Sequence, residues 1–159
     1  MTTTIRLQRE AFDVAAEVAA LTRGRTDIGA VVTFTGICRA DEDGAPIAAL
    51  TLEHYPRMAE AEIARHIEEA RARWPLLGMT VVHRYGRLVP GEPIVLVVTA
   101  SSHRQAAFTA AEFLMDFLKT RAPFWKQVET FAGTSWVEAK AADDVAADRW
   151  SAPPRREVR

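Results

Sequence analysis

The pattern of apolar and polar residues predicts two long amphipathic helices. In the segment 57–74 apolar residues form one stripe at helical spacing, with glutamate, arginine and histidine elsewhere. Segment 104–121 repeats this pattern, and a proline, Pro75 or Pro123, follows each helix and ends it. A shorter helix is predicted for residues 12–23. The expected core positions are Ile63, Ile67, Ala70 and Trp74 in the first long helix and Ala107, Phe108, Ala111, Leu114, Met115 and Leu118 in the second.

Segments rich in β-branched and apolar residues predict the strands. Residues 30–38 (AVVTFTGIC) and 47–55 (IAALTLEHY) flank the turn-like DEDG at 41–44, so we expect these two strands to pair as a hairpin. A closing pair of strands is expected around Gly133. The remaining predicted strands are residues 4–8, 79–86 and 93–101, and the closing pair covers 125–131 and 134–139.

Hairpins mixed with helices indicate an α+β domain rather than a doubly wound parallel sheet. The sequence contains neither of the glycine-rich phosphate motifs, GxGxxG and GxxxxGK[ST], and it lacks the GxSxG elbow of serine hydrolases. Nucleotide binding of those two types and that hydrolase chemistry therefore have no support.

Length and composition predict one domain. The 159 residues, 48% of them hydrophobic, suffice for one core, which we expect over residues 1–150, with a disordered tail at 151–159. Twenty basic and 21 acidic side chains create no overall field for nucleic acid or an anionic membrane. No apolar run approaches the roughly 20 residues that span a bilayer, and the first ten residues lack the apolar region of a signal peptide. A cytoplasmic location is expected.

The cysteine and histidine positions argue against metal and redox chemistry. Cys38 is the only cysteine, which rules out an internal disulfide, a CxxC motif and a cysteine-based zinc site. We interpret it as a small buried hydrophobic residue. His54, His66 and His83 have no metal-ligand spacing, so structural or solvated roles are expected for them. No metal and no cofactor is predicted.

Cationic residues stand at the ends of predicted elements, where side chains converge. Arg39 closes the first apolar strand, while His103 and Arg104 begin the second long helix, whose free N–H groups and dipole favour an anion. Simpler interpretations stay open here. Arg39 would form a surface salt bridge, and Ser101 or Ser102 would cap the helix beside an incidental basic residue.

The stretch LKTRAPFWKQ at 118–127 places two lysines, Lys119 and Lys126, on either side of a proline and two aromatic residues. Taken alone, it is also explained by solvated lysines around packing residues. The wider sequence decides between these interpretations.

The sequence contains five motifs that together carry a family resemblance. The motifs are TFTGICR at 33–39, LEHYPRMAE at 52–60, HRYGRLVPGE at 83–92, SSHRQAAF at 101–108 and MDFLKTRAPFWKQ at 115–127. In this order and at this spacing they resemble the large, catalytic subunit of molybdopterin synthase. One motif alone is weak evidence, whereas five in order are highly specific. The resemblance runs from about residue 5 to residue 150.

This resemblance implies an α/β-hammerhead fold and a reaction that builds the dithiolene of molybdopterin. Two sulfur atoms are added to cyclic pyranopterin monophosphate. Each arrives as a thiocarboxylate on the C-terminal Gly-Gly tail of a small ubiquitin-like partner subunit. A chain with one cysteine, outside any activating motif, is a poor persulfide carrier, so an external sulfur source also suits this sequence.

The resemblance also implies site residues. Lys119 and Lys126 correspond to active-site lysines, and we assign the principal acid/base or acyl-contacting role to Lys119 and the supporting role to Lys126. Two ammonium groups held close disfavour each other's charge, so at least one should exchange a proton near neutrality, while the other can hold phosphate or an oxyanion. Pro123 and its aromatic neighbours would turn Lys126 back toward Lys119. The implied substrate-binding residues are Ile37, Cys38, Arg39, His103, Arg104, Lys119, Lys126, Gln127 and Val128.

One position departs from the family pattern. The segment WVEAK at 136–140 ends in Lys140 where the family often has arginine. If this position contacts phosphate, the charge is kept but bidentate geometry is lost.

Distance along the second long helix predicts a homodimer. His103 and Lys119 are sixteen residues apart, or roughly 24 Å at about 1.5 Å per residue, which exceeds the length of a pterin monophosphate. We therefore expect His103 and Arg104 of one protomer to complete a pocket that holds Arg39, Lys119 and Lys126 of the other. Two small partners would make the assembly a heterotetramer. The alternative is a bent helix or separate subsites.

Two other functions stay open. The chain could be a non-catalytic binding module whose lysines recognise the acidic tail of a ubiquitin-like protein. It could also be another small phosphate-ligand enzyme on the same scaffold.

Overall fold

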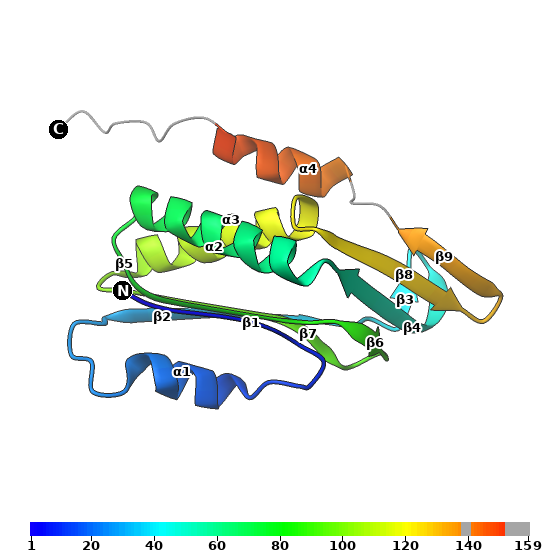
Figure 1. Ribbon diagram of the computed structural model, residues 1–159, viewed down its shortest axis with the longest axis horizontal. Helices are drawn as coiled ribbons and strands as arrows, with labels where there is room; N and C mark the ends of the chain where they lie inside the picture. The colour runs from blue at the N-terminus through cyan, green and yellow to red at the C-terminus, as the bar shows by residue number, and fades with distance from the viewer. Residues whose placement is uncertain (138–140, 152–159) are drawn as a thin grey trace.

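The computed structural model of the protein describes residues 1–137 and 141–151. Within these residues the chain folds into two sheets with helices around the first (Figure 1). In chain order the elements are β1 (Thr2–Gln8), α1 (Val14–Thr22), β2 (Ala30–Ile37), β3 (Asp41–Glu42), β4 (Ala45–His54), α2 (Pro56–Arg73), β5 (Leu76–Arg84), β6 (Gly86–Leu88), β7 (Pro93–Ser101), α3 (Arg104–Thr120), β8 (Phe124–Thr130), β9 (Gly133–Val137), α4 (Ala141–Asp148) and the short 3-10 helix η1 (Arg149–Ser151).

The first sheet carries the larger core. Its strand order is β1-β5-β7-β2, in which β1 runs parallel to β5 and the other neighbours are antiparallel. Figure 1 shows α1 on one face of this sheet and α2 and α3 on the other. Because side chains alternate along a strand, Met79 and Val81 of β5 pack toward α2 and α3, while Val82 joins the core beneath α1.

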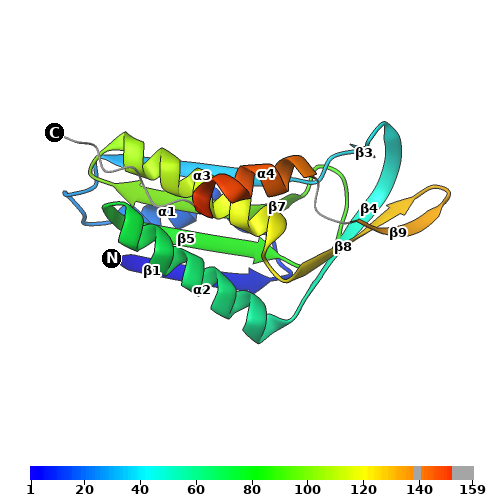
Figure 2. The ribbon, with the colours of Figure 1, turned by 90° about the horizontal axis from the view of Figure 1, so that it is seen from above.

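The second sheet has five strands and lies beyond one end of the first (Figure 2). Its strand order is β3-β4-β8-β9, and β6 also pairs with β4. A separate apolar cluster stabilises it, built from Cys38, Leu50, Leu52, Leu88 and Val128 with their neighbours. The α+β fold class predicted from the sequence is confirmed.

Both long helices are present, with one error in the predicted core. The predicted stripe of α2 packs into the core. In α3 the buried face also includes Ala110, Phe113 and Phe117, whereas Phe108 is 60% exposed. The Phe108 prediction was wrong because a buried stripe covers 100° or more of a helix, so periodicity alone leaves its edges undefined.

The hairpin predicted between residues 30–38 and 47–55 is wrong. β2 pairs with β7 and β4 pairs with β8, so the two strands belong to different sheets. The DEDG turn closes a shorter hairpin between β3 and β4, with Asp43 and Gly44 at φ values of 49° and 82°. After Ile37 the chain leaves the first sheet, and the Cys38 amide donates to the Glu92 carbonyl at 2.8 Å. The hairpin around Gly133 is confirmed as β8 and β9.

The helix α4 was not predicted, because its eight residues carry mainly alanine and aspartate and show no long apolar stripe. Polar contacts anchor this C-terminal segment on α3. The Trp150 indole donates to Asp116 at 2.7 Å, and Arg149 pairs with the same carboxylate at 2.8 Å. Ser151, expected to begin a tail, ends η1 instead, and residues 152–159 lie outside the described part. No helix of the described residues is long and apolar enough to cross a membrane.

Candidate active site

A cavity of about 710 Å³ lies where the two sheets meet. Apolar side chains supply most of its wall, and a few charged groups stand among them, which is the usual composition of a small-molecule site. The C-terminal half of α3, the end of β2, and strands β4, β8 and β9 all contribute. The lining includes Phe34, Ile37, Arg39, Glu42, His83, Met115, Leu118, Lys119, Phe124 and Lys126.

All three lysines of this chain are candidate site residues, namely Lys119, Lys126 and Lys140. Lys119 belongs to the last turn of α3 and Lys126 to β8, and both line the cavity. Between them the helix ends, with the amide of Arg121 donating to the carbonyl of Phe117 at 2.8 Å. The structure therefore brings these two lysines to one site from two elements. Lys140 lies outside the described residues.

Glu42 forms an ion pair with Lys126. This contact is not apparent from the sequence alone. The Lys126 ammonium lies 3.3 Å from the Glu42 carboxylate, and the Arg39 guanidinium lies 3.7 Å from the same group. The residue had been assigned only to a turn, because the contact depends on the β4–β8 pairing. Arg39 thus lines the cavity and also forms the salt bridge that was its alternative interpretation.

The other predicted substrate residues fall into two groups. Ile37 lines the cavity and is 55% exposed. Cys38 and Val128 are buried in the core of the second sheet, behind the cavity wall. Gln127 follows the cavity-lining Lys126 in β8 but does not itself line the cavity. The structure therefore gives Cys38 and Val128 supporting positions rather than open ones.

Replacing Cys38 with serine should leave most of the activity intact. Burial raises the pKa of the Cys38 thiol, which disfavours the thiolate needed for nucleophilic or persulfide chemistry. Its sulfur lies 3.7 Å from the Arg39 carbonyl, a partner that a serine hydroxyl can also reach. The measurement is product formation by Cys38→Ser beside the wild type. A persulfide on Cys38 in mass spectra, or an inactive but folded variant, would contradict this.

His103 and Arg104 lie at the opposite end of α3 from Lys119. His103 is the N-cap residue and Arg104 the first helical residue, and both are exposed and away from the cavity. The predicted serine cap is wrong, because His103 is the N-cap and makes no side-chain capping bond. The Ser101 hydroxyl accepts from the His103 amide at 3.4 Å and donates to the Pro75 carbonyl, and the Ser102 hydroxyl donates to the Asp27 carbonyl. A single chain does not bring this basic pair to the lysines.

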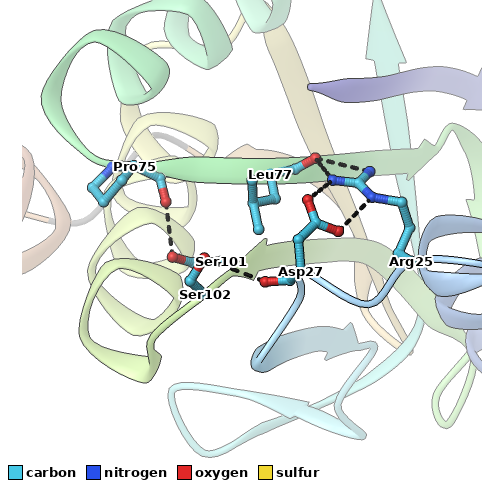
Figure 3. A network of polar contacts seen from close by, with 6 residues as sticks. All are labelled: Arg25, Asp27, Pro75, Leu77, Ser101 and Ser102. Carbon is cyan, nitrogen blue, oxygen red and sulfur yellow. Dashed lines mark hydrogen bonds and ion pairs between the residues drawn. The ribbon is translucent and has the colours of Figure 1, made fainter.

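The turn before α3 is clamped to the loop that precedes β2 (Figure 3). Arg25 and Asp27 form a bidentate ion pair at 2.8 Å, and Arg25 also donates to the Leu77 carbonyl at 3.5 Å. The Gly29 amide donates to the Ser101 carbonyl at 3.0 Å. A Cβ on Gly29 would lie 2.2 Å from the Ser102 carbonyl oxygen, so only glycine permits this approach. These contacts fix the position of the exposed basic pair.

His83 is an uncharged group on the cavity wall. Burial lowers the pKa of His83, the nearby charges of His54 and Lys119 act in the same direction, and the hydrogen bond to the Arg84 carbonyl opposes them, which leaves the pKa at about 4. Its ring stacks on Phe124, with centroids 4.0 Å apart. The His54 ring also stacks on Phe124, with the two ring centroids 5.8 Å apart. The sequence pattern predicts a structural or solvated role for His83.

Acid should destabilise the protein through His83. In the unfolded chain the imidazole binds its proton near pH 6.5, but in the folded chain only near pH 4, so stability is lost as pH falls through this window. The loss is about 3 kcal/mol for this residue at most. Urea unfolding between pH 7 and pH 4 should therefore show a shallower pH dependence for His83→Phe than for the wild type. Identical slopes would contradict the assignment.

The described residues contain no cluster of histidine, cysteine, aspartate and glutamate able to hold a metal ion. The site is a largely apolar cavity in which Lys126 is paired with a carboxylate and Lys119 has no such partner among the described residues. Such a site can bind an anionic ligand and transfer protons.

Known proteins resemble this chain over most of its length. The family model described as MoaE protein matches residues 7–121. The molybdopterin synthase catalytic subunit of Mesorhizobium japonicum is 64% identical over 149 residues, covering 92% of each chain. The protein of the same name from Rhizobium meliloti is 62% identical over 150 residues, covering 93% of this chain and 96% of the relative.

Solved structures with names of the same family superpose on this chain. The molybdopterin biosynthesis MoaE protein from Burkholderia ambifaria superposes with a TM-score of 0.80 and 47% identity, covering 96% of this chain and all of the other. The molybdopterin synthase from Staphylococcus aureus superposes with a TM-score of 0.77 at 29% identity, covering 83% and 95%. The chain therefore belongs to the MoaE protein family, the catalytic subunits of molybdopterin synthase, an enzyme of molybdenum cofactor biosynthesis.

Proposed function

We propose that this chain converts cyclic pyranopterin monophosphate to molybdopterin, with the sulfur carried by a small ubiquitin-like partner. The sulfur of the partner's C-terminal thiocarboxylate forms the new carbon–sulfur bond, while a carbon–oxygen bond at that substrate carbon breaks and its oxygen leaves as water or stays on the opened phosphate. Water takes the acyl group, so the partner leaves with a carboxylate, and two such transfers complete the dithiolene. The observation that carries this proposal is the convergence of Arg39, Lys119 and Lys126 on one cavity.

The two lysines suit different tasks in this reaction. Lys126 faces Glu42 and Arg39, so its charge is shared within a network suited to holding a phosphate or an oxyanion. Lys119 has no ion pair with any described residue, which leaves its ammonium available to the acyl group and the departing proton. We therefore keep the principal role for Lys119.

Apolar walls support acyl chemistry over simple hydrolysis. Phe34, Met115 and Leu118 line the cavity beside Lys119. A site that excludes water strengthens charge interactions with the substrate and limits premature hydrolysis of the thiocarboxylate. An extended Gly-Gly tail has no side chains and can enter such a cavity beside the pterin.

A homodimer within a heterotetramer is part of the proposal. His103 and Arg104 are exposed at the far end of α3, away from the cavity of their own chain. The nearby strand β2 is an edge of the first sheet, and Phe34 and Phe108 are 39% and 60% exposed. An open edge with exposed aromatic residues supports pairing with a second copy. The expected cytoplasmic location and the absence of a cofactor complete the proposal.

One incubation tests the function. The chain is mixed with cyclic pyranopterin monophosphate and a partner carrying a C-terminal thiocarboxylate, and the dithiolene product is assayed. Product formation is expected. If the partner binds but no product appears, the chain is the non-catalytic tail-binding module. If neither the partner nor the pterin binds, another phosphate-ligand enzyme on this scaffold is the better description.

A further inference from the structure

Glu42 is an acidic residue on the wall of a cavity that the proposed reaction uses to bind anions. Its side chain is 12% exposed and lines the cavity together with Arg39 and Lys126. Asp143 also lines the cavity, but in the described chain Glu42 alone forms ion pairs with the cavity's cations. Because a carboxylate repels an anionic ligand, attraction of the substrate does not explain this residue.

A tight turn fixes the position of Glu42. The residue pairs with Ala45 across the β3–β4 hairpin. Between them, Asp43 and Gly44 have φ values of 49° and 82°, and two successive residues with positive φ give a hairpin a defined register. The Gly44 amide also donates to the Asp41 carboxylate at 3.2 Å. The carboxylate of Glu42 is therefore held on the cavity wall by a structured hairpin.

Two cations of the cavity meet on the Glu42 carboxylate. The Lys126 ammonium lies 3.4 Å from one of its oxygens and 3.3 Å from the other, and the Arg39 guanidinium lies 3.7 Å from the second oxygen. We call these three residues the Glu42 cluster. Its two positive groups and one negative group leave one net positive charge. An anion that binds to both cations therefore lies close to Glu42.

The substrate and the product of the proposed reaction differ in the charge of their phosphate. The cyclic phosphate of the substrate is a diester with one negative charge. When a carbon–oxygen bond of that ring breaks and the oxygen stays on the phosphate, the phosphate becomes a monoester. The second pKa of a monoester is about 6, so it carries nearly two negative charges at pH 7. The Glu42 cluster balances the charge of the first ligand but not that of the second.

We propose that Glu42 is a specificity-determining residue, which makes the cluster favour a singly charged phosphate over a doubly charged one. Its carboxylate repels each negative charge of a ligand held by Arg39 and Lys126, so the opened product is repelled about twice as strongly as the cyclic substrate. The cluster therefore retains the substrate and releases the product. The inference rests on the proposed function, because that function supplies the two ligands.

Two nucleotides with the same base and sugar serve as probes. Cyclic guanosine monophosphate is a diester with one negative charge, and guanosine monophosphate is a monoester with two at pH 8. The dissociation constant of each probe is measured at pH 8 with the full chain, and the readout is the ratio of the two constants. If neither probe binds the wild type or Glu42→Gln, the cluster holds no phosphate and the proposal is overturned.

Glu42→Gln removes the charge and keeps the size of the side chain. A ligand charge about 6 Å from the carboxylate, at an effective dielectric constant of about 40, changes the affinity about tenfold. We therefore expect the cyclic nucleotide to bind about tenfold more tightly and the monoester about 100-fold more tightly, so that the ratio shifts about tenfold. A change in packing affects both probes alike and cancels in the ratio. Equal shifts for the two probes, or no shift, would overturn the proposal.

Three further variants separate charge from structure. Glu42→Asp keeps the charge and should retain the wild-type ratio. The matched control is Glu129→Gln, because Glu129 pairs with Arg87 at 3.0 Å in the same sheet but outside the cavity, and the ratio should not change. If Glu42→Gln does not fold, Glu42→Asn is compared with Glu42→Asp, since these side chains have the same length and differ in charge. Equal ratios in that pair would contradict the inference.

Inhibition by the product supplies a second readout. In Glu42→Gln the inhibition constant of the opened product, divided by the KM of the substrate, should fall about tenfold. An unchanged quotient would count against the inference. The nucleotide measurement needs no sulfur transfer. Failure of the proposed function would therefore show in the wild-type incubation, whereas failure of the Glu42 inference would show in the ratio of the two dissociation constants.

Discussion

Lys119→Ala is expected to reduce product formation by about 100- to 10,000-fold, the range typical of losing a general acid or base. Lys119 lines the cavity without an ion-pair partner in the described chain, whereas the other two cations of the cavity, Arg39 and Lys126, are both paired with Glu42. The measurement is single-turnover conversion of the pterin substrate with saturating thiocarboxylated partner. Unfolding curves should match the wild type, because the side chain lies on a cavity wall rather than in the core.

Two other variants serve as comparisons for Lys119→Ala. Arg121→Ala removes a cation two residues away that pairs with Asp148 of α4 at 3.1 Å and does not line the cavity. It should retain near-wild-type turnover, since exposed ion pairs contribute little. Lys126→Ala should be impaired, but less than Lys119→Ala. Wild-type turnover in Lys119→Ala would remove this lysine from the mechanism.

Much of the fold was predictable because the local sequence of these elements favours the structure that they adopt. The stripe of α2 repeats at helical spacing and β7 is a continuous run of β-branched and apolar residues, and both elements lie where expected. The turn between the two cavity lysines also follows from local chemistry, since Pro123 cannot continue a helix. The family resemblance then supplied roles that no periodicity contains.

The wrong or missing predictions share a physical cause, because contacts between distant parts of the chain decide what the local sequence leaves open. DEDG forms a turn as predicted, yet β2 pairs with β7 rather than with β4, because pairing depends on which strand completes each sheet. Glu42 and His83 were missed for the same reason. Each is an ordinary residue in its local sequence and becomes part of a site only when distant strands meet.

Mixing two inactive variants should restore activity if the site is shared between protomers. Arg104→Ala lacks the basic residue at the start of α3, and Lys119→Ala lacks the lysine at its end. In a mixed dimer, the Arg104→Ala chain supplies an intact Lys119 and the Lys119→Ala chain an intact Arg104, so one of the two sites is whole. Half of the dimers are mixed after random exchange, which predicts recovery of about a quarter of wild-type activity.

The geometry of α3 is why this recovery is expected. The helix has 17 residues and is therefore about 25 Å long. Its N-terminal pair is held outward by the clamp of Arg25, Asp27 and Gly29, while Lys119 faces the cavity at the other end. Neither a local rearrangement of the clamped turn nor a rotamer change spans that length. If labelled protomers exchange and activity stays absent, each site is built within one chain, and the basic pair serves a separate subsite.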